Sequence, residues 1–277
     1  MVKVVITAAG RGLRLLPFTK NIPKEMMPIF FQDKKEKLIV PFLHYVFDQL
    51  YDLKIRDFYF VIGKDNILIK NYFSKNTQLT KIIPSSYKKN INSFTKKISN
   101  SNIKWIKQKI PKGFGDAIKI TSKFIRDESF IVQAGDTTFI SKNNSPMTRL
   151  INTAKANPSA SAIFLVKKVS NPKRYGIATI KKIKNNLFAV KNVEEKPKKP
   201  KSCYAIMPLY YFKPIVYDCL REISPGHGKE YQLTDAIQLL IEKGYSVLAI
   251  PLLKNDIELD IGTIDSYRDA QINSFNH

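Results

Sequence analysis

Residues 2–7 (VKVVIT) form a run of mostly β-branched, apolar side chains, and a glycine-containing turn at residues 8–12 follows directly. Such a run is typical of a strand buried on both faces of a parallel sheet. Apolar residues then recur at helical spacing over residues 40–53, where Pro41 suits the first turn, and residues 57–63 form a second apolar run that ends in glycine. Strand, helix and strand in this order predict a βαβ unit, and therefore an α/β fold with a parallel sheet and crossover helices.

Similar patterns continue along the rest of the chain. They predict further strands at residues 103–108, 129–136, 160–169, 175–183, 204–212 and 245–251, and further helices at residues 116–124, 232–243 and 263–273. Asn185 and Asn186 indicate a turn, and Thr234 or Asp235 is expected near a helix start as a cap and first-turn acid. Residues 71–102 are polar and lack a clean period, so we expect an insertion with one weak helix.

The charge balance is unusual for a chain of this size. With 277 residues the chain is long enough for one large domain or two small ones, and its formal charge is +23, from 46 Lys and Arg against 23 Asp and Glu. Such an excess suggests a polyanionic partner, either nucleic acid or phosphorylated small molecules, unless it reflects only a lysine-rich surface.

Hydropathy, repeats and cysteine usage exclude several other classes. No apolar stretch approaches about 18 residues, so we expect no transmembrane span, and the first residues lack the features of a signal peptide. No repeat of roughly 20–50 residues and no hexapeptide repeat is present, which argues against a solenoid or a β-helix extension. One disulfide between Cys203 and Cys219 is an alternative, but free thiols in a cytoplasmic protein are favoured.

Gly10 and Gly12 lie directly after the first predicted strand, with Arg14 and Lys24 further along the chain. Backbone N–H groups in such a turn can approach phosphate oxygens closely, and the two bases add positive charge. The segment is neither a Walker A loop nor a dinucleotide-binding fingerprint, since Leu15 stands where the latter has its third glycine. A simple turn with surface bases is the alternative interpretation.

Two segments, GRGLRLLP at residues 10–17 and PKEMMP at residues 23–28, resemble the signature of the sugar-1-phosphate nucleotidylyltransferases. Leu13 replaces the Thr or Ser that is usual in that signature. The resemblance runs from Val4 to Ala270 and is strongest for the branch of bacterial-type UTP–glucose-1-phosphate uridylyltransferases.

This resemblance implies a Rossmann-like, three-layer α/β/α fold with a mixed sheet and without a β-helix extension. It also implies a single nucleotidyltransferase domain over residues 1–277. Within it we expect a nucleotide-binding half at residues 1–140, a sugar-binding half at residues 141–277, and the polar insertion at residues 71–102.

The resemblance assigns roles to the first half of the chain. Arg14 would hold the triphosphate and Lys24 would neutralise charge around the reacting α-phosphate. The residues expected to wrap the nucleotide are Ala8, Ala9, Gly10 and Gly12.

Gln108 and Gly113 match the base-recognition segment of the same family. A glutamine amide offers one acceptor and two donors, which suits the imide edge of uracil or thymine. Gly113 permits close approach of the backbone.

Two carboxylates are candidate metal ligands. Asp136 follows Gly135 at the carboxyl end of a predicted central strand, where ligands bind in open α/β sheets, and a carboxylate there suits Mg²⁺. A capping role is the alternative. Asp260, in a segment that resembles the family's Asp-x-Gly element, is the second candidate and is ranked below Asp136.

The sugar phosphate is expected in the second half of the chain. By resemblance, Glu195 would bind sugar hydroxyls, Lys196 the sugar phosphate, and the backbone of Gly176 a further hydroxyl. A charged loop is the alternative interpretation of the first two residues. Residues 230–237 (EYQLTDAI) are interpreted as a structural helix start behind the sugar site.

The resemblance, together with these residues, implies the transfer of a uridylyl group from UTP to glucose 1-phosphate, giving UDP-glucose and pyrophosphate with the assistance of Mg²⁺. Glucose-1-phosphate thymidylyltransferase, or another member of the family, is the main alternative. A basic nucleic-acid-binding protein and a relative that binds sugar nucleotides without turnover are less favoured. Relatives often form dimers or tetramers, so a homo-oligomer stays open.

Overall fold

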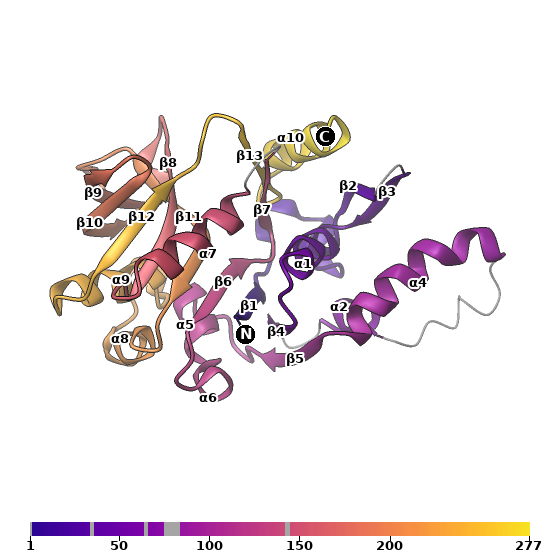
Figure 1. Cartoon of the computed structure of the whole chain (residues 1–277), viewed down its shortest axis with the longest axis horizontal. Helices are drawn as coiled ribbons and strands as arrows, with labels where there is room; N and C mark the ends of the chain where they lie inside the picture. The colour runs from indigo at the N-terminus through magenta and orange to yellow at the C-terminus, as the bar shows by residue number, and fades with distance from the viewer. Residues whose placement is uncertain (1, 34–35, 64–65, 75–83, 142–144) are drawn as a thin grey trace.

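A nine-stranded mixed sheet runs through the protein, with strand order β5-β4-β1-β6-β11-β8-β12-β10-β9 (Figure 1). The structure is a computed structural model that describes residues 2–33, 36–63, 66–74, 84–141 and 145–277. The strands of this sheet are β1 (Lys3–Ala8), β4 (Asp57–Ile62), β5 (Asn102–Lys107), β6 (Phe130–Ala134), β8 (Ala162–Lys168), β9 (Gly176–Lys184), β10 (Leu187–Glu195), β11 (Tyr204–Phe212) and β12 (Val247–Pro251).

Two smaller antiparallel sheets pair β2 (Pro28–Asp33) with β3 (Glu36–Pro41) and β7 (Thr137–Ser141) with β13 (Asp256–Asp260). The α-helices are α1 (Phe42–Asp52), α2 (Ile67–Tyr72), α4 (Ser85–Ser99), α5 (Phe114–Lys119), α6 (Ser122–Ile125), α7 (Pro146–Ala156), α8 (Val216–Glu222), α9 (Leu233–Glu242) and α10 (Ile264–Phe275).

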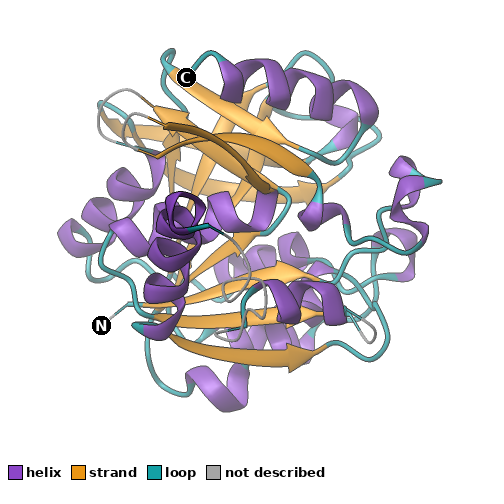
Figure 2. Ribbon diagram, turned by 90° about the vertical axis from the view of Figure 1, so that its right-hand side faces the viewer, coloured by secondary structure: helices purple, strands orange, loops and turns teal. Residues whose placement is uncertain are grey.

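The half of the sheet that contains β1 is parallel. β1 pairs with β4 and β6, and β4 pairs with β5. Val4 and Ile6 of β1 pack into one buried cluster with residues of α1, whereas Val5 packs into a second cluster with residues of α5, α8 and α9. Helices therefore lie against both faces of these strands (Figure 2), which explains the unbroken apolar run and confirms the predicted βαβ unit.

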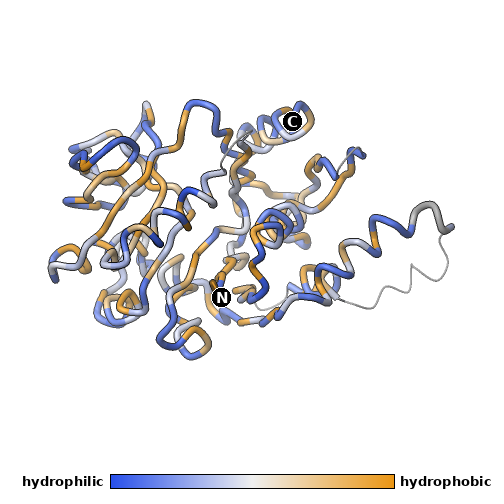
Figure 3. The backbone as a smooth tube through the Cα atoms, in the orientation of Figure 1, coloured by the Kyte–Doolittle hydropathy of each residue, from blue (hydrophilic) through white to orange (hydrophobic). Residues whose placement is uncertain are grey.

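The other half of the sheet is largely antiparallel. β11 is antiparallel to β6 and β8, while β12 is parallel to β8 and antiparallel to β10. β9 and β10 form a hairpin at the predicted Asn185–Asn186 turn, where Asn186 adopts a left-handed conformation with φ 58°. The α/β fold with a mixed sheet is thus as expected, and hydrophobic stretches follow its central strands (Figure 3).

Several predicted boundaries were wrong. The helix expected at residues 40–53 begins only at Phe42, because Val40 and Pro41 complete β3 and pair with Ile29 and Pro28. Pro41 precedes the helix rather than lying in its first turn. The short strands β2, β3, β7 and β13 and the helices α2, α7 and α8 were not predicted.

Two expected helices differ in detail. The one predicted at residues 116–124 is divided into α5 and α6, with the buried Thr121 between them. At the start of α9, the N-cap is Gln232, without a side-chain capping bond; Thr234 lies within the helix and Asp235 supplies the acid of the first turn.

The polar insertion, where one weak helix was expected, contains the regular helix α4. α4 spans 15 residues, and its Phe94 stacks on His44 of α1 with ring centroids 3.8 Å apart. Lys97 of α4 forms an ion pair with Asp48 of α1. Residues 75–83 of the insertion lie outside the described residues.

Cys203 is exposed and Cys219 is buried, and both are free thiols, which excludes the alternative of a disulfide between them. Among the described residues, none of the helices has the length and apolar character required to cross a membrane.

A buried ion pair joins α7 to β13. Arg149 donates to both carboxylate oxygens of Asp256, at 3.2 and 2.5 Å, and the Asp256 side chain is only 1% exposed. Asp256→Ala leaves a guanidinium in this site without its main counter-charge. We therefore expect the free energy of unfolding, measured by urea denaturation, to fall by about 3–5 kcal/mol.

The matched control is Asp218→Ala, which removes an exposed ion pair with Arg221. Exposed pairs contribute roughly 0–1 kcal/mol, so this variant should be close to wild type. Equal small losses in both variants would contradict the structural role of Asp256.

Candidate functional site

The carboxyl ends of β5, β4, β1 and β6 lie side by side, because the parallel registers place their last residues level. The turn at residues 9–12 follows β1, Gln108 follows β5, and Asp136 follows β6. Ligands bind at this edge in open α/β sheets. Three of the sequence-predicted segments therefore meet where a substrate is expected.

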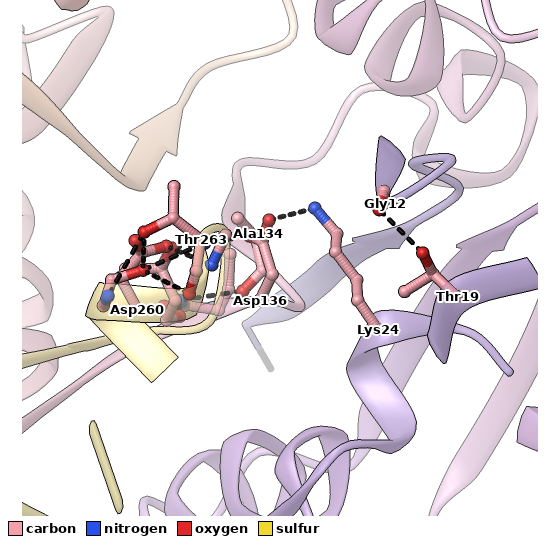
Figure 4. Close-up of polar contacts among 11 residues, drawn as sticks. Gly12, Thr19, Lys24, Ala134, Asp136, Asp260 and Thr263 are labelled. Atoms are coloured by element: carbon pink, nitrogen blue, oxygen red, sulfur yellow. Dashed lines mark hydrogen bonds and ion pairs between the residues drawn. The ribbon is translucent and has the colours of Figure 1, made fainter. Parts of the chain in front are cut away.

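The turn after β1 depends on the conformation of Gly12 and on its contacts with Thr19. Gly12 has φ 63°, and a Cβ on it would lie 2.9 Å from Cγ2 of Thr19, so both its conformation and its surroundings favour glycine. The Thr19 hydroxyl donates to the Gly12 carbonyl at 2.7 Å (Figure 4). Arg14 is exposed, and within the described residues its side chain makes no hydrogen bond or ion pair.

Lys24 forms an ion pair with Asp136 (Figure 4). The two side chains are 16% and 23% exposed. Burial opposes the charge on each, yet the pair and its hydrogen bond hold the pKa of Asp136 below its ordinary value and the pKa of Lys24 above it. Gly10 leaves room for this contact, since a Cβ there would lie 3.3 Å from the Lys24 ammonium.

Asp260 lies next to Asp136 because β13 pairs with β7 directly after the Gly135–Asp136 corner. Asp260 is paired with Thr137, whose hydroxyl lies 3.4 Å from Asp136 Oδ1 and 3.5 Å from Asp260 Oδ1. Burial raises the pKa of Asp260, and the negative charge of Asp136 raises it further. The site thus places two carboxylates together beside one lysine.

This pair of carboxylates fits a magnesium ion. Mg²⁺ prefers oxygen ligands and is commonly held by one or two carboxylates together with substrate phosphates. The repulsion between Asp136 and Asp260 is an electrostatic strain that a divalent cation between them would relieve. Among the residues that the structure describes, no group of three or more acids, histidines or cysteines offers a self-sufficient metal site.

Gln108 lies on a rigid support beside the same edge. Its backbone N–H donates to Ile62 O at 2.9 Å, and its side-chain amide donates to Asp116 Oδ2 at 2.8 Å and to Gly113 O at 3.2 Å. Gly113 has φ 108°, and a Cβ on it would lie 2.7 Å from the carbonyl oxygen of Tyr231. The structure therefore joins the two predicted base-binding residues.

Glu195 and Gly176 are paired across the β9–β10 hairpin. Thr234 of α9 donates its hydroxyl to Glu195 Oε2 at 2.6 Å, and a Cβ on Gly176 would lie 2.8 Å from Thr234 Cγ2. Lys196 has φ 43°, and its ammonium lies 3.7 Å from Glu195 Oε1. A left-handed conformation in a non-glycine residue is uncommon and recurs at functional sites.

The structure therefore assembles the predicted site residues into groups. Lys24, Asp136 and Asp260 form one, Gln108 with Gly113 a second, and Gly176, Glu195 and Lys196 a third. Within the described part of the chain, Arg14 forms no hydrogen bond or ion pair with any of these groups.

Sequence reasoning did not single out Thr137, Asp116 or Thr234 as parts of the site. Each of them contacts a predicted site residue, and Thr234 reaches Glu195 from a different part of the chain. Thr234 was predicted only as a possible helix cap, and the EYQLTDAI segment that contains it was interpreted as a structural helix start behind the sugar site.

A family model described as Nucleotidyl transferase matches residues 3–276. The chain belongs to the nucleotidyl transferase family. The predicted resemblance and the assignment to nucleotidyltransferases are thereby confirmed.

Two curated members of the family illustrate the similarity. The UTP–glucose-1-phosphate uridylyltransferase of Bacillus subtilis (strain 168) is 36% identical over 245 residues, which are 87% of this chain and 80% of that one. UTP–glucose-1-phosphate uridylyltransferase 1 of Staphylococcus saprophyticus is 35% identical over 243 residues, which are 86% and 81% of the two chains.

Solved structures of nucleotidyl transferases agree with the fold. A crystal structure of an apo UDP-glucose pyrophosphorylase superposes with a TM-score of 0.88 at 25% identity, covering 100% of this chain and 99% of that one. A UTP-bound UDP-glucose pyrophosphorylase (UGPase) from Acinetobacter baumannii superposes with a TM-score of 0.85 at 23% identity, covering 100% of this chain and 95% of that one. At 23% identity, the similarity to the second structure shows only that the two proteins share a fold.

Glu25, next to Lys24, is a buried acid with one unpaired oxygen. Its side chain is 1% exposed, and Oε2 has no hydrogen-bond partner within the described part of the chain. Burial raises the pKa of Glu25 to about 7, with Lys24 opposing and Asp136 adding to the rise. No role was predicted for Glu25, although it lies in the PKEMMP segment.

The shifted pKa of Glu25 predicts a pH-dependent stability. Between the ordinary pKa of 4.5 and about 7, the native protein holds a proton that the unfolded chain has released. The free energy of unfolding therefore falls as the pH rises, by roughly 3 kcal/mol from this group. Glu25→Gln should remove this fall, as measured by urea denaturation at several pH values across the range.

Glu194→Gln is the matched control, because Glu194 is exposed. It should leave the pH profile unchanged. Parallel profiles for wild type and Glu25→Gln would show that Glu25 does not carry the effect.

Proposed function

We propose that the chain transfers the uridylyl group of UTP to glucose 1-phosphate, forming UDP-glucose and releasing pyrophosphate. The observation that carries this proposal is the placement of Lys24, Asp136 and Asp260 at the carboxyl edge of the parallel strands. Curated relatives that match most of the chain are uridylyltransferases of this kind.

The two halves of the chain divide the substrates between them in this proposal. Residues 1–140 hold UTP, with the turn at residues 8–12 and Arg14 on the phosphates and with Gln108 and Gly113 on the base. Residues 141–277 hold glucose 1-phosphate. Glu195 and the Gly176 backbone bind sugar hydroxyls, and Lys196 binds the sugar phosphate.

The reaction is an in-line displacement at the α-phosphorus. An oxygen of the sugar phosphate forms the new bond to phosphorus, and the bond to the β-phosphate oxygen breaks as pyrophosphate leaves. The attacking oxygen is already anionic, so the site requires no general base. Positioning and charge neutralisation carry the catalysis, as in other transfers at phosphorus.

Each basic residue has a separate task in this mechanism. Lys24 neutralises charge at the α-phosphate, Lys196 holds the attacking phosphate, and Arg14 becomes ordered on the triphosphate. Asp136 and Asp260 would hold Mg²⁺, which supplies further charge neutralisation and orientation of the phosphates. Lys24 would contact the substrate in place of Asp136, which would leave that carboxylate available to hold Mg²⁺.

The direct test is a matrix of UTP, dTTP, CTP, ATP and GTP against several sugar 1-phosphates, read by pyrophosphate release. UTP with glucose 1-phosphate should have the highest kcat/KM. A higher value with dTTP would identify a thymidylyltransferase, and a higher value with another sugar phosphate would change the proposed acceptor.

Lys196→Ala and Asp136→Asn should each lower kcat with saturating substrates. Loss of one electrostatic contact to the reacting groups costs about 3–4 kcal/mol, or roughly 10²–10³ in rate. Lys199→Ala, at an exposed lysine of the same loop, is the control for the loss of one positive charge. Near-normal turnover in both site variants would contradict their proposed roles.

Thr234→Val removes the hydroxyl that fixes Glu195. A hydrogen bond to a charged group contributes about 1.5–3 kcal/mol, so KM for glucose 1-phosphate should rise by roughly tenfold or more while KM for UTP stays constant. Thr234→Ser retains the hydroxyl and should behave as wild type. An equal rise in both KM values would indicate a general structural defect instead.

A further inference from the structure

The side-chain amide of Gln108 has both of its donor hydrogens engaged within the protein. One Nε2–H points to Asp116 Oδ2 at 2.8 Å and the other to Gly113 O at 3.2 Å. A carboxylate and a carbonyl oxygen only accept hydrogen bonds, so the NH₂ group of the amide must face them. The reverse orientation would place the amide oxygen against two other oxygens.

The remaining atom, Gln108 Oε1, is left for a ligand. None of the hydrogen bonds among the described residues uses it. Among the described residues, Glu25 Oε2 is the one side-chain atom that is fully buried and has no hydrogen-bond partner. Gln108 Oε1 also has no partner, so it must keep some contact with solvent, although Gln108 as a whole is only 5% exposed. The residue thus presents a single fixed acceptor.

The support for this acceptor is rigid. Gly115 N–H donates to Tyr231 O at 2.9 Å, and Tyr231 N–H donates to Lys112 O at 2.8 Å. These bonds attach both the loop before α5 and the first turn of α5 to the segment before α9. Asp116 lies in the first turn of α5, directly after this attachment. The carboxylate therefore cannot follow Gln108 if the amide rotates.

We propose that Asp116 sets the base specificity of the nucleotide site by locking Gln108 with its acceptor toward the base. Uracil and thymine carry a hydrogen on N3 and can donate to this acceptor, whereas N3 of cytosine is itself an acceptor and is repelled. Specificity then comes from a carboxylate that does not touch the base. This inference rests on the proposed function, because it places the base at Gln108.

Asp116→Asn tests this positioning role. An asparagine can either accept from or donate to Gln108, so it no longer forces the NH₂ group of Gln108 inward. Only the carbonyl of Gly113, at 3.2 Å, then opposes the reversed amide, and part of the protein can turn its NH₂ group toward the base. The ratio of kcat/KM for UTP to that for CTP should fall by about tenfold or more, a loss of roughly 1.4 kcal/mol of discrimination, in part through a gain of activity with CTP. A purely structural defect would lower both activities and leave the ratio unchanged.

Asp127→Asn, the same change at an exposed position, is the matched control. Asp116→Ser creates the same ambiguity with a smaller side chain and serves if the first variant does not fold. An unchanged ratio in the folded Asp116 variants, or a wild-type protein that does not prefer UTP over CTP, would overturn the inference.

Calorimetric titration of wild type and variants with UTP and with CTP, without sugar phosphate, separates this inference from the proposed function. A UTP preference that Asp116→Asn abolishes supports the role of Asp116 even if glucose 1-phosphate is not the acceptor. Equal preferences in the two proteins would overturn it even if wild type makes UDP-glucose.

Discussion

The ion pair between Lys24 and Asp136 joins parts of the chain that are 112 residues apart. It attaches the segment after the glycine turn to the end of β6. The pairing of β13 with β7 places Asp260 opposite Thr137, and therefore next to Asp136. Because both partners are largely buried, each needs the other, and removal of one leaves an uncompensated charge. In the proposed function, Lys24 and Asp136 would give up this contact with each other, Lys24 to bind a phosphate and Asp136 to bind a cation.

The sequence predicted the elements whose pattern is local and missed those that depend on distant partners. β1, β4 and β6 were found because burial on both faces demands continuous apolar runs. β7 and β13 were missed because neither carries such a run; they exist as strands because Thr137 and Asp260 pair across more than a hundred residues of chain. The start of α1 was predicted two residues before Phe42 for the same reason. Val40 is apolar and lies at helical spacing, but it belongs to β3 because it pairs with Ile29 of β2.

The functional site shows the same difference between residues with a local sequence signal and residues whose role depends on distant partners. Lys24, Asp136, Glu195 and Lys196 could be singled out because each lies in a motif, and the structure joins them in contacting groups. Thr234 and Asp116 act on other residues, not through a motif of their own, so their contacts with Glu195 and Gln108 become visible only once the chain is folded. Residues that hold a functional side chain in one orientation are in general harder to predict than the side chain itself, since a hydroxyl or a carboxylate has many alternative uses.

The net charge of +23 is unevenly distributed over the protein. Several acids are engaged in internal pairs, as Asp136 is with Lys24, Asp256 with Arg149 and Asp48 with Lys97, so they contribute little negative potential at the surface. Residues 167–201, which include the hairpin that carries Glu195 and Lys196, hold 12 Lys or Arg against two Glu. Such an excess creates a positive field over that half that would attract the phosphorylated substrates of the proposed reaction, and salt screens it over a Debye length of about 8–10 Å. In the proposed function, long-range attraction and short-range selection would be carried by different residues: exposed lysines would attract anions, and Gln108, held by Asp116, and Glu195, held by Thr234, would distinguish among them.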